Sequence, residues 1–402
     1  MATTPRYASA MRGVVVSSNV GSWSVHAGRV ASRVARVALC AGMCAGCAAR
    51  GGARGDRAVD DPGACAVDIA GVGTVVDSPS EARRIERHGL PAHQLSGIVH
   101  WHDDRYLAIG DDGAAFLWEL RIAIDDASGA LDAAEVVGSL PLAEPPRDGE
   151  ALAWIDGRTR LLLADEEDST TIEYAIARAG DERPARASFV ARRTANAVFA
   201  PEAVRPNLGL ESLGAFDGWV WSASEDARRE DGPCATVAVG AIVRIDRRDP
   251  SGAPVGQWAY RTDPVPARAI RADLERSGVV EIVPLARDAA LVLERAVGGL
   301  PLPVVRSRLY AIDVRGATDI GSVASLDEAG VEPLAKRLLW EDDAAGANYE
   351  GLATGPRLAD GRVPLVLVAD DGGGAMGQRG MVRVLLWSSG RAAVQTDIGD
   401  GR

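Results

Sequence analysis

The stretch GEALAWIDGRTRLLLADEED, residues 149–168, contains two apolar runs separated by a polar turn. The first run opens beside an acid, Glu150, and the second ends in acids from Asp165 onward. Short apolar runs that are bounded by Gly, Asp and other polar residues are typical of β-strands. We therefore interpret this stretch as a β-hairpin that carries carboxylates where its two strands meet the preceding and following loops.

The same pattern occurs four more times, in LSGIVHWHDDRYLAIGDDG (95–113), LESLGAFDGWVWSASED (210–226), VEIVPLARDAALVLER (280–295) and YEGLATGPRLADGRVPLVLVADDG (349–372). Successive units start 54, 61, 70 and 69 residues apart, counted from Ser96, Glu150, Glu211, Glu281 and Glu350. Repeats of this length made of short strands are typical of β-propellers. The sequence predicts an all-β, single-domain β-propeller with six blades, of which five are legible as repeats.

Further apolar runs follow each hairpin and can supply the outer strands: 117–125, 170–177, 241–248, 308–314 and 381–389. The isolated run VDIAGVGTVV (67–76) precedes the first unit, and we expect it to pair with the C-terminal strands and close the ring. Closure removes the sheet edges that would otherwise invite aggregation. Helical patterns are few; the best covers 266–278 and predicts a short helix that ends at Gly278.

Composition limits the possible functions. The chain has 402 residues, of which 47% are hydrophobic, so it can build a core. Its net charge of −12 argues against binding to nucleic acid and against electrostatic attachment to anionic lipid. Nothing in the sequence indicates an oligomeric state.

The first 46 residues contain five arginines, no acid and the apolar stretch VALCAGMCAG (37–46). A basic segment followed by a short apolar segment and small residues predicts a signal peptide over 1–46. Ala45-Gly46-Cys47 also resembles a bacterial lipobox, so Cys47 is a candidate for lipidation, with simple cleavage as the alternative. We expect a flexible tether over 47–64 and the propeller domain over 65–402, in an exported protein of the bacterial periplasm or cell envelope.

Two cysteines follow Cys47, namely Cys65 and Cys234. An even pair in an oxidising compartment makes a Cys65–Cys234 disulfide a reasonable expectation. Two free buried thiols are the alternative, because the sequence does not indicate how far apart the residues lie.

If the five units are blades, the equivalent strand ends face one another around the propeller axis. The acids that open the units then form one ring: Glu150, Glu211, Glu281 and Glu350. The acids that end the second runs form another: Asp111, Asp165, Glu225, Glu294 and Asp370. Unpaired carboxylates repel one another and are costly to bury, and Ca²⁺, which takes oxygen ligands, would compensate for this.

Structural roles compete with metal binding at these positions. A glutamate at the start of a strand can accept hydrogen bonds from backbone amides of the next blade and fasten the ring. The Asp-Gly pairs that follow the strands, at Asp112 and Asp371, are also common in ordinary turns. Four of the five histidines lie between His88 and His102, where a polar loop competes with a metal site. A Gly-x-Ser-x-Gly nucleophile motif does not occur.

The ordered short motifs of the five units resemble the phytase-like family, described as having esterase-like activity of phytase. The resemblance runs from about Leu95 to Asp371 and rests on five motifs: Leu95-Ser96-Gly97, Asp148-Gly149-Glu150-Ala151-Leu152, Asn207-Leu208-Gly209-Leu210-Glu211-Ser212-Leu213, Leu291-Val292-Leu293-Glu294-Arg295, and Asn348-Tyr349-Glu350-Gly351-Leu352 with Leu367-Val368-Ala369-Asp370. It implies an exported β-propeller and, more loosely, a hydrolase of phosphate or other esters. In the propeller phytases that lend the family its name, calcium joins an acidic face to a phosphate.

Two functional hypotheses follow. The first is a Ca²⁺-dependent hydrolase of small-molecule esters or phosphate esters, with Glu211 or Glu350 as the catalytic base. Its candidate metal ligands are Asp111, Glu150, Asp165, Glu211, Glu225, Glu350 and Asp370. The second is a non-catalytic envelope propeller that binds a ligand or a protein, in which the glutamate ring is structural. In both, contact with a membrane is expected only through a lipid on Cys47.

Overall fold

The computed structural model describes residues 72–389, except 112–114, 179–183, 195–196, 268–274, 300–303, 343–346 and 374–377. All of the described residues belong to one compact unit, Pro62–Arg402. The predicted signal peptide (1–46), the tether (47–64) and the lipidation candidate Cys47 lie outside the described residues. Within the described residues, no helix has the length and apolar character that crossing a membrane requires.

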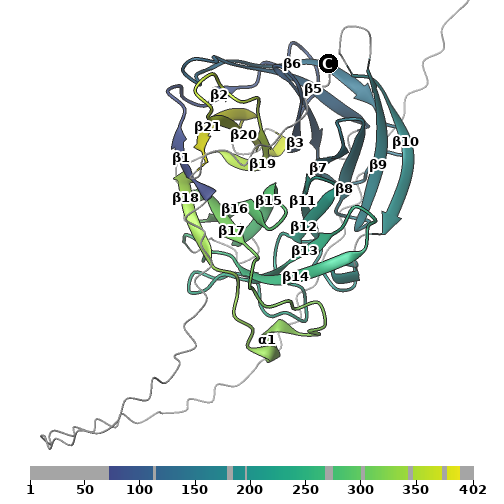
Figure 1. Cartoon of the computed structure of the whole chain (residues 1–402), viewed down its shortest axis with the longest axis vertical. Coiled ribbons are helices and arrows are strands. Elements are labelled where there is room, and N and C mark those ends of the chain that lie inside the picture. Colours follow the sequence, from purple (N-terminus) through teal and green to yellow (C-terminus); the bar gives the residue numbers. More distant parts are fainter. Residues whose placement is uncertain are drawn as a thin grey trace, which may run out of the picture. The chain divides into compact units, whose positions relative to one another are not determined.

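The described strands form five antiparallel sheets, which are the blades of a β-propeller (Figure 1). Blade 1 contains β3 (Leu95–His102), β4 (Arg105–Gly110), β5 (Phe116–Ile124) and β6 (Leu131–Pro141). Blade 2 contains β7 (Gly149–Asp156), β8 (Arg160–Asp165), β9 (Thr170–Arg178) and β10 (Pro184–Thr194). Blade 3 contains β11 (Leu210–Phe216), β12 (Trp219–Ser224), β13 (Ile242–Arg248) and β14 (Pro254–Arg261). Blade 4 contains β15 (Arg276–Ala286), β16 (Ala289–Gly298), β17 (Val304–Asp313) and β18 (Lys336–Asp342).

Blade 5 combines the two ends of the described chain. It contains β19 (Asn348–Thr354), β20 (Val363–Asp370), β21 (Met381–Ser388) and the N-terminal strand β1 (Thr74–Asp77), and the short β2 (Arg83–Arg84) also pairs with β21. Strand β1 runs antiparallel to β21, with Thr74 opposite Ser388 and Asp77 opposite Leu385. The predicted closure of the ring by the 67–76 run is confirmed for its described part, and every predicted outer strand is present.

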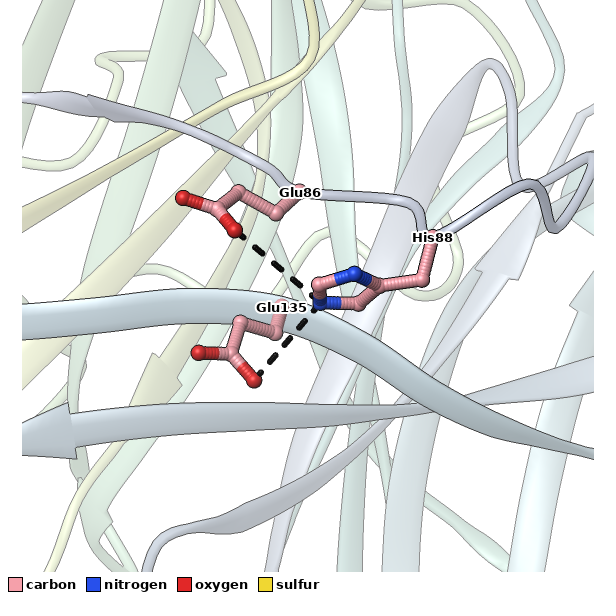
Figure 2. Close-up of side chains that lie close together, drawn as sticks. All are labelled: Glu86, His88 and Glu135. Carbon is pink, nitrogen blue, oxygen red and sulfur yellow. Dashed lines mark ion pairs between the residues drawn. The ribbon is translucent and has the colours of Figure 1, made fainter.

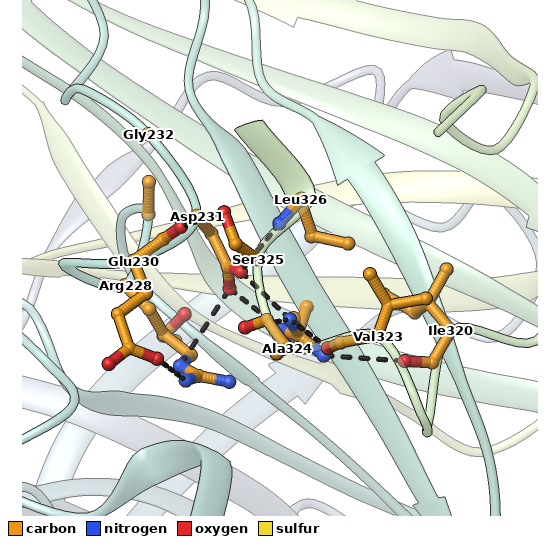
Figure 3. Close-up of polar contacts among 12 residues, drawn as sticks. Arg228, Glu230, Asp231, Gly232, Ile320, Val323, Ala324, Ser325 and Leu326 are labelled. Carbon is orange, nitrogen blue, oxygen red and sulfur yellow. Dashed lines mark hydrogen bonds and ion pairs between the residues drawn. The ribbon is translucent and has the colours of Figure 1, made fainter. Parts of the chain in front are cut away.

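The expected sixth blade is wrong: the described residues form five blades. The wide spacings that suggested a hidden blade are taken up by two long loops, 225–241 in blade 3 and 314–335 in blade 4. The two loops pack on each other around a buried ion pair, in which Arg244 Nε donates to Asp231 at 2.7 Å. Arg244 also donates to the carbonyl of Val323 at 2.8 Å, and the Leu326 amide at the start of α1 (Leu326–Ala329) donates to Asp231 at 3.1 Å (Figure 3).

The core lies between neighbouring blades, where the apolar faces of two sheets pack together. Five clusters of buried residues occupy the five blade interfaces; Ile98 and Val366, for example, share the interface of blades 1 and 5. Burial of such faces stabilises a fold by about 25 cal/mol per Å² of apolar surface. The closed ring of interfaces holds the inner strands β3, β7, β11, β15 and β19 around the centre (Figure 1).

The predicted helix over 266–278 is wrong at its C-terminal end, and residues 268–274 are not described. Gly278 does not cap a helix but lies inside strand β15. A Cβ atom at this position would lie 2.5 Å from Glu225 Cγ and 2.6 Å from the Glu225 carbonyl oxygen. The glycine therefore permits blade 4 to approach the acid at the end of the first hairpin of blade 3.

Candidate functional site

Each inner strand carries a β-bulge near its start. In β11, Leu210 lies opposite Ser224 and Ser212 lies opposite Ala223, so Glu211 is the extra residue. The other inner strands have a register shift directly after Leu95, Gly149, Val279 and Tyr349, and the next residue of each strand is equivalent to Glu211: Ser96, Glu150, Val280 and Glu350. A bulge turns a side chain away from the regular alternation of a strand, so it can direct these residues towards a site.

A second set of equivalent residues lies on the strand that pairs with each inner strand or directly after it. Each comes directly after the partner of the residue that precedes the bulge: Asp111, Glu166, Glu225, Arg295 and Asp370. The amide of Glu225 donates to the Gly209 carbonyl at 2.9 Å, and the amides of Asp111 and Glu166 make the same bond in blades 1 and 2. We call the two sets of five residues together the axial cluster.

The strand register changes which residues belong to the two rings that the sequence spacing predicted. Val280 occupies the bulge position of blade 4, and Glu281 is one residue further along. Glu166 replaces Asp165 in the second set, and Arg295 replaces Glu294. The axial cluster thus contains seven carboxylates and one guanidinium, together with Ser96 and Val280.

Neighbouring bulges touch one another. A Cβ atom on Gly351 of blade 5 would lie 2.2 Å from the Ser96 carbonyl oxygen of blade 1. A Cβ atom on Gly97 would lie 2.8 Å from the Glu150 carbonyl oxygen of blade 2. Backbone contacts this close require glycine, and they hold the side chains of adjacent bulges in the same region.

Arg295 organises one side of the axial cluster. Its guanidinium forms buried ion pairs with Glu225 of blade 3 and Glu350 of blade 5, and it also donates to Asn348 Oδ1 at 3.4 Å. Burial opposes the charged form of Arg295, but the two carboxylates outweigh it and raise the pKa of the guanidinium. Burial raises the pKa of Glu350 to about 8 although Arg295 acts to lower it. This side of the cluster is internally compensated.

On the other side, the cluster residues Glu150 and Glu166 of blade 2 lie close to a third carboxylate, that of Asp148, which precedes β7. One oxygen from each lies within 4.8 Å of the other two, and we call this group the acidic triad. Ser96 Oγ donates to Glu150 at 2.6 Å, and the Gly209 amide donates to Glu166. Burial is the main cause that raises the pKa of Glu166 to about 8 and that of Glu150 well above its ordinary value, with help from the neighbouring carboxylates.

Glu211 lies beside the acidic triad. Its residue is 5% exposed, and among the described residues its carboxylate has neither a hydrogen bond nor an ion pair. Burial first, and then the charges of Glu150, Glu225 and Glu166, raise the pKa of Glu211 well above its ordinary value, although the charge of Arg295 acts to lower it. A buried acid without a partner is costly and is characteristic of functional sites.

Glu281 accepts hydrogen bonds from backbone amides, including one of a neighbouring blade. This is the structural role that the sequence analysis gave as the alternative to metal binding. Its Oε1 accepts from the Ile282 amide at 3.0 Å and from the Leu213 amide of blade 3 at 3.4 Å. Burial raises the pKa of Glu281 well above its ordinary value, although the amides of Ile282, Leu213 and Leu352 act to lower it. Glu281 therefore ties the inner strand of blade 4 to that of blade 3.

Two other acids of the predicted second ring also have protein partners. Asp165 is fully buried and accepts from Arg192 Nη1 at 2.6 Å. Glu294 accepts from Tyr260 Oη at 2.5 Å and from the Asp263 amide at 2.8 Å, and it pairs with Lys336.

The acids of the last hairpin have partners of their own. Asp370 accepts from the Gly372 amide at 2.7 Å, which is the turn chemistry expected of an Asp-Gly sequence. Asp371 accepts from the Gln94 amide at 2.9 Å and pairs with Arg87 and His93. Asp111 is half-buried at the end of β4, and residues 112–114 after it are not described.

The histidines do not form one site. His88 lies by Glu86 and Glu135, while His93 lies by Asp371. His100 Nε2 hydrogen-bonds to the Asp103 carbonyl at 2.9 Å, and burial and Arg158 lower the pKa of its imidazole to about 4.

Cys234 is a free, half-buried thiol. Cys65 lies outside the described residues, so the Cys65–Cys234 disulfide stays a prediction. The Cys234 thiol lies against Asp226, and burial together with this carboxylate raises its pKa to about 11.

Sequence reasoning missed Asp148, Glu166 and Arg295 as members of the site. Asp148 lies two residues before the predicted residue Glu150, and Glu166 directly follows the predicted residue Asp165. The pairing of Gly149 with Asp165 makes Glu166 the equivalent of Glu225 in blade 3. The ligand atoms that the acidic triad offers to a metal ion are all carboxylate oxygens, which a hard cation such as Ca²⁺ prefers. The unpartnered Glu211 adds a negative charge that such a cation would compensate, so these residues fit a calcium ion.

Several solved structures are similar to this chain at low identity. A luciferin-regenerating enzyme is 9% identical, with 77% of this chain and 97% of that chain covered and a TM-score of 0.36. An α-L-arabinanase of Penicillium chrysogenum complexed with arabinobiose is 13% identical, with coverage of 77% and 97% and a TM-score of 0.34. The Cps50 (Swd1) β-propeller domain of Myceliophteria thermophila is 8% identical, with coverage of 79% and 100% and a TM-score of 0.32.

No curated protein matches the chain. A sequence model of the phytase-like family, described as esterase-like activity of phytase, matches residues 91–373. The match covers more than half of the chain and all five inner hairpins, and it agrees with the resemblance drawn from the short motifs. The protein belongs to the phytase-like family.

Proposed function

We propose that this protein is a Ca²⁺-dependent hydrolase of small-molecule phosphate esters or other esters. In this proposal Asp148, Glu150 and Glu166 hold the cation, and Glu211 is the catalytic base. The observation that carries it is Glu211, a carboxylate that is 5% exposed, has no partner among the described residues and lies against the acidic triad. Such a group suits a reaction better than it suits the stability of the fold.

The other acids that the sequence put forward as ligands are less suited to a cation. Asp165 is paired with Arg192, Glu225 and Glu350 are paired with Arg295, and Asp370 is bound in a turn. Ligand exchange at these positions would leave buried arginines without their counter-charges. Glu350 is therefore the weaker of the two candidate bases.

The chemistry divides between the cation and the chain. A bound Ca²⁺ would polarise a phosphoryl or carbonyl oxygen and favour ionisation of a water. Glu211 would accept the proton of that water at a carboxylate oxygen, because a carboxylate with a raised pKa takes up protons more readily. Ser96 and the Gly209 amide would hold Glu150 and Glu166 in place through their hydrogen bonds.

The charge of the protein is consistent with this division. The chain has a net charge of −12, so an anionic ester would be repelled from the axial cluster unless a cation lay between them. A requirement for Ca²⁺ follows directly for phosphate esters and is weaker for neutral ones.

The test is hydrolysis of p-nitrophenyl phosphate and p-nitrophenyl acetate with Ca²⁺ or with a chelator. We expect turnover only with Ca²⁺, and a loss of at least a hundredfold in Glu211→Gln. Glu281→Gln is the matched control, because it changes a buried glutamate of a neighbouring strand that binds backbone amides. A folded protein that hydrolyses neither ester in either condition refutes the hydrolase proposal.

A non-catalytic propeller that binds a ligand or a protein in the cell envelope is the second candidate. It is favoured by the compensated side of the cluster, where Arg295 pairs with carboxylates of two other blades, and by Glu281, which accepts from a backbone amide of blade 3. Binding of Ca²⁺ without turnover would support this candidate over the first.

We also propose that the protein is exported to the periplasm or cell envelope, on the strength of the basic and apolar segment before Cys47. Mass spectrometry of the mature N-terminus distinguishes a lipidated Cys47 from simple cleavage. An intact basic segment in the mature protein would contradict export.

A further inference from the structure

A second group of metal-ligating side chains, drawn in Figure 2, includes Glu135 of β6, the outermost strand of blade 1. His88 Nε2 lies 4.0 Å from Glu86 Oε2 and 3.8 Å from Glu135 Oε2. One ligand atom from each of the three residues lies within 4.8 Å of the other two. Figure 2 shows the imidazole directed between the two carboxylates.

The backbone fixes all three residues relative to one another. Glu86 and Glu135 face each other across an isolated parallel bridge. The Glu86 amide donates to the Ala134 carbonyl at 2.9 Å, and the Val136 amide donates to the Glu86 carbonyl at 2.8 Å. His88 follows in a left-handed conformation with φ of 49°, which turns the chain back over the bridge.

The distances suit ligands around an ion better than they suit direct contacts. Separations of 3.8 and 4.0 Å are too long for hydrogen bonds. Two ligand atoms on a tetrahedral Zn²⁺ lie roughly 3.4 Å apart, as bond lengths near 2.1 Å require. Small rotations of Glu86 and His88, which are 70% and 55% exposed, would close the difference.

The charges of the group also leave room for a cation. Two carboxylates face one imidazole, and the one nearby guanidinium among the described ion pairs, that of Arg121, lies 3.5 Å from the other oxygen of Glu135. One nitrogen and two oxygen ligands suit a borderline divalent transition ion, whereas Ca²⁺ takes oxygen ligands alone.

We propose that Glu86, His88 and Glu135 form a surface site for a divalent transition metal ion such as Zn²⁺. The site joins the segment that follows β2 to β6, the outermost strand of blade 1. Because β2 pairs with β21 of blade 5, this segment passes from the last blade to the first. A bound ion therefore fastens the closure of the ring, and its effect is on stability and not on the proposed hydrolysis.

The experiment measures the melting temperature of the whole protein with Zn²⁺ alone, and Co²⁺ absorption as a report of coordination. We expect Zn²⁺ to raise the melting temperature by several degrees, since a ligand that binds only the folded state stabilises it. His88→Gln should weaken binding at least tenfold. His102→Gln is the matched control, because His102 is 36% exposed and lies 3.0 Å from one carboxylate, that of Asp103.

Three outcomes would overturn the proposal: no effect of Zn²⁺ on the wild type, an equal effect on His88→Gln, or an equal loss in His102→Gln. Glu86→Gln provides a second variant if His88→Gln folds poorly, because Glu86 is 70% exposed. Glu211→Gln should leave Zn²⁺ binding unchanged, which separates this site from the axial cluster.

Discussion

The two sides of the axial cluster use equivalent positions in opposite ways. On the side of blades 3, 4 and 5, Arg295 neutralises Glu225 and Glu350 through buried ion pairs. On the side of blades 2 and 3, three carboxylates of the acidic triad lie within 4.8 Å of one another, and Glu211 beside them has no partner among the described residues. The difference depends on one residue, because Arg295 stands where blades 2 and 3 have Glu166 and Glu225.

Within one ring, the charged groups on one side therefore stabilise the fold through ion pairs, and the carboxylates on the other side remain available for a function. A buried ion pair is stable only while both partners remain, whereas crowded carboxylates are tolerated only when protons or a cation compensate for them. Substitutions on the two sides should therefore change stability in opposite directions.

The largest effect is expected on the compensated side. Arg295→Met should lower the free energy of unfolding by about 3–5 kcal/mol, because it leaves Glu225 and Glu350 buried without a counter-charge. Urea denaturation measures the change. Arg383→Met is the matched control, since Arg383 pairs with Asp77 and Asp342 at the outside of the ring; a smaller loss for Arg295→Met than for this control would contradict the assignment.

A smaller loss is expected at the amide tie between blades 3 and 4. Glu281→Leu should lower the free energy of unfolding by about 1–3 kcal/mol, because the amides of Ile282 and Leu213 lose their acceptor while buried. Glu281→Gln keeps an acceptor oxygen and should recover most of the loss in the same urea measurement. Equal stability of the leucine and glutamine variants would show that the amide bonds contribute nothing.

Much of the fold could be predicted from the repeat. The inner hairpins, the outer strands and the closing strand at 74–77 follow from short apolar runs between turn residues. The number of blades could not be predicted from spacing, because loops 225–241 and 314–335 lengthen two units without adding strands. Their packing depends on Arg244 and Asp231, two charged residues with nothing in their local sequence to mark them as buried.

The site was predicted less well, and the reason is the bulge. A bulge inserts one residue into a strand, so it changes which neighbouring side chain reaches the axis. Glu281 matches Glu211 by spacing but lies one position past it by register. The sequence could not show whether Asp165 or Glu166, and whether Glu294 or Arg295, belongs to the second set, because both residues of each adjacent pair are charged.

The pH dependence tests the crowded side without a substitution. The folded pKa of Glu166, a member of the acidic triad, is raised to about 8 from an ordinary value of 4.5, so its stabilising protonation is complete in acid and is lost as pH rises through about 8. In chelator, the melting temperature should fall from about pH 6.5 to about pH 8.5. This pH range excludes the contribution of His100. Its imidazole has a lowered pKa of about 4, so it makes the stability of the protein rise with pH below about pH 6.5.

Added Ca²⁺ should reduce this dependence on pH, because a cation compensates the ionised carboxylates. A melting temperature that stays constant or rises across the window in chelator would show that the triad is not strained by its charges.

The smallest effect is expected at Glu211, and its sign separates the two sides of the cluster. Glu211→Gln removes a buried carboxylate that has no partner among the described residues and that is repelled by Glu150, Glu225 and Glu166. In chelator at about pH 8 the variant should therefore be more stable than the wild type by about 1 kcal/mol in urea denaturation, as expected when a costly buried acid is replaced by an amide. With Ca²⁺, the wild type should be as stable as the variant or more stable. The bound cation then compensates the charge of the Glu211 carboxylate, whereas the variant has no charge at this position for the cation to compensate. Because Arg295→Met is destabilising in both conditions, a destabilised Glu211→Gln in chelator would place Glu211 on the structural side with Glu281.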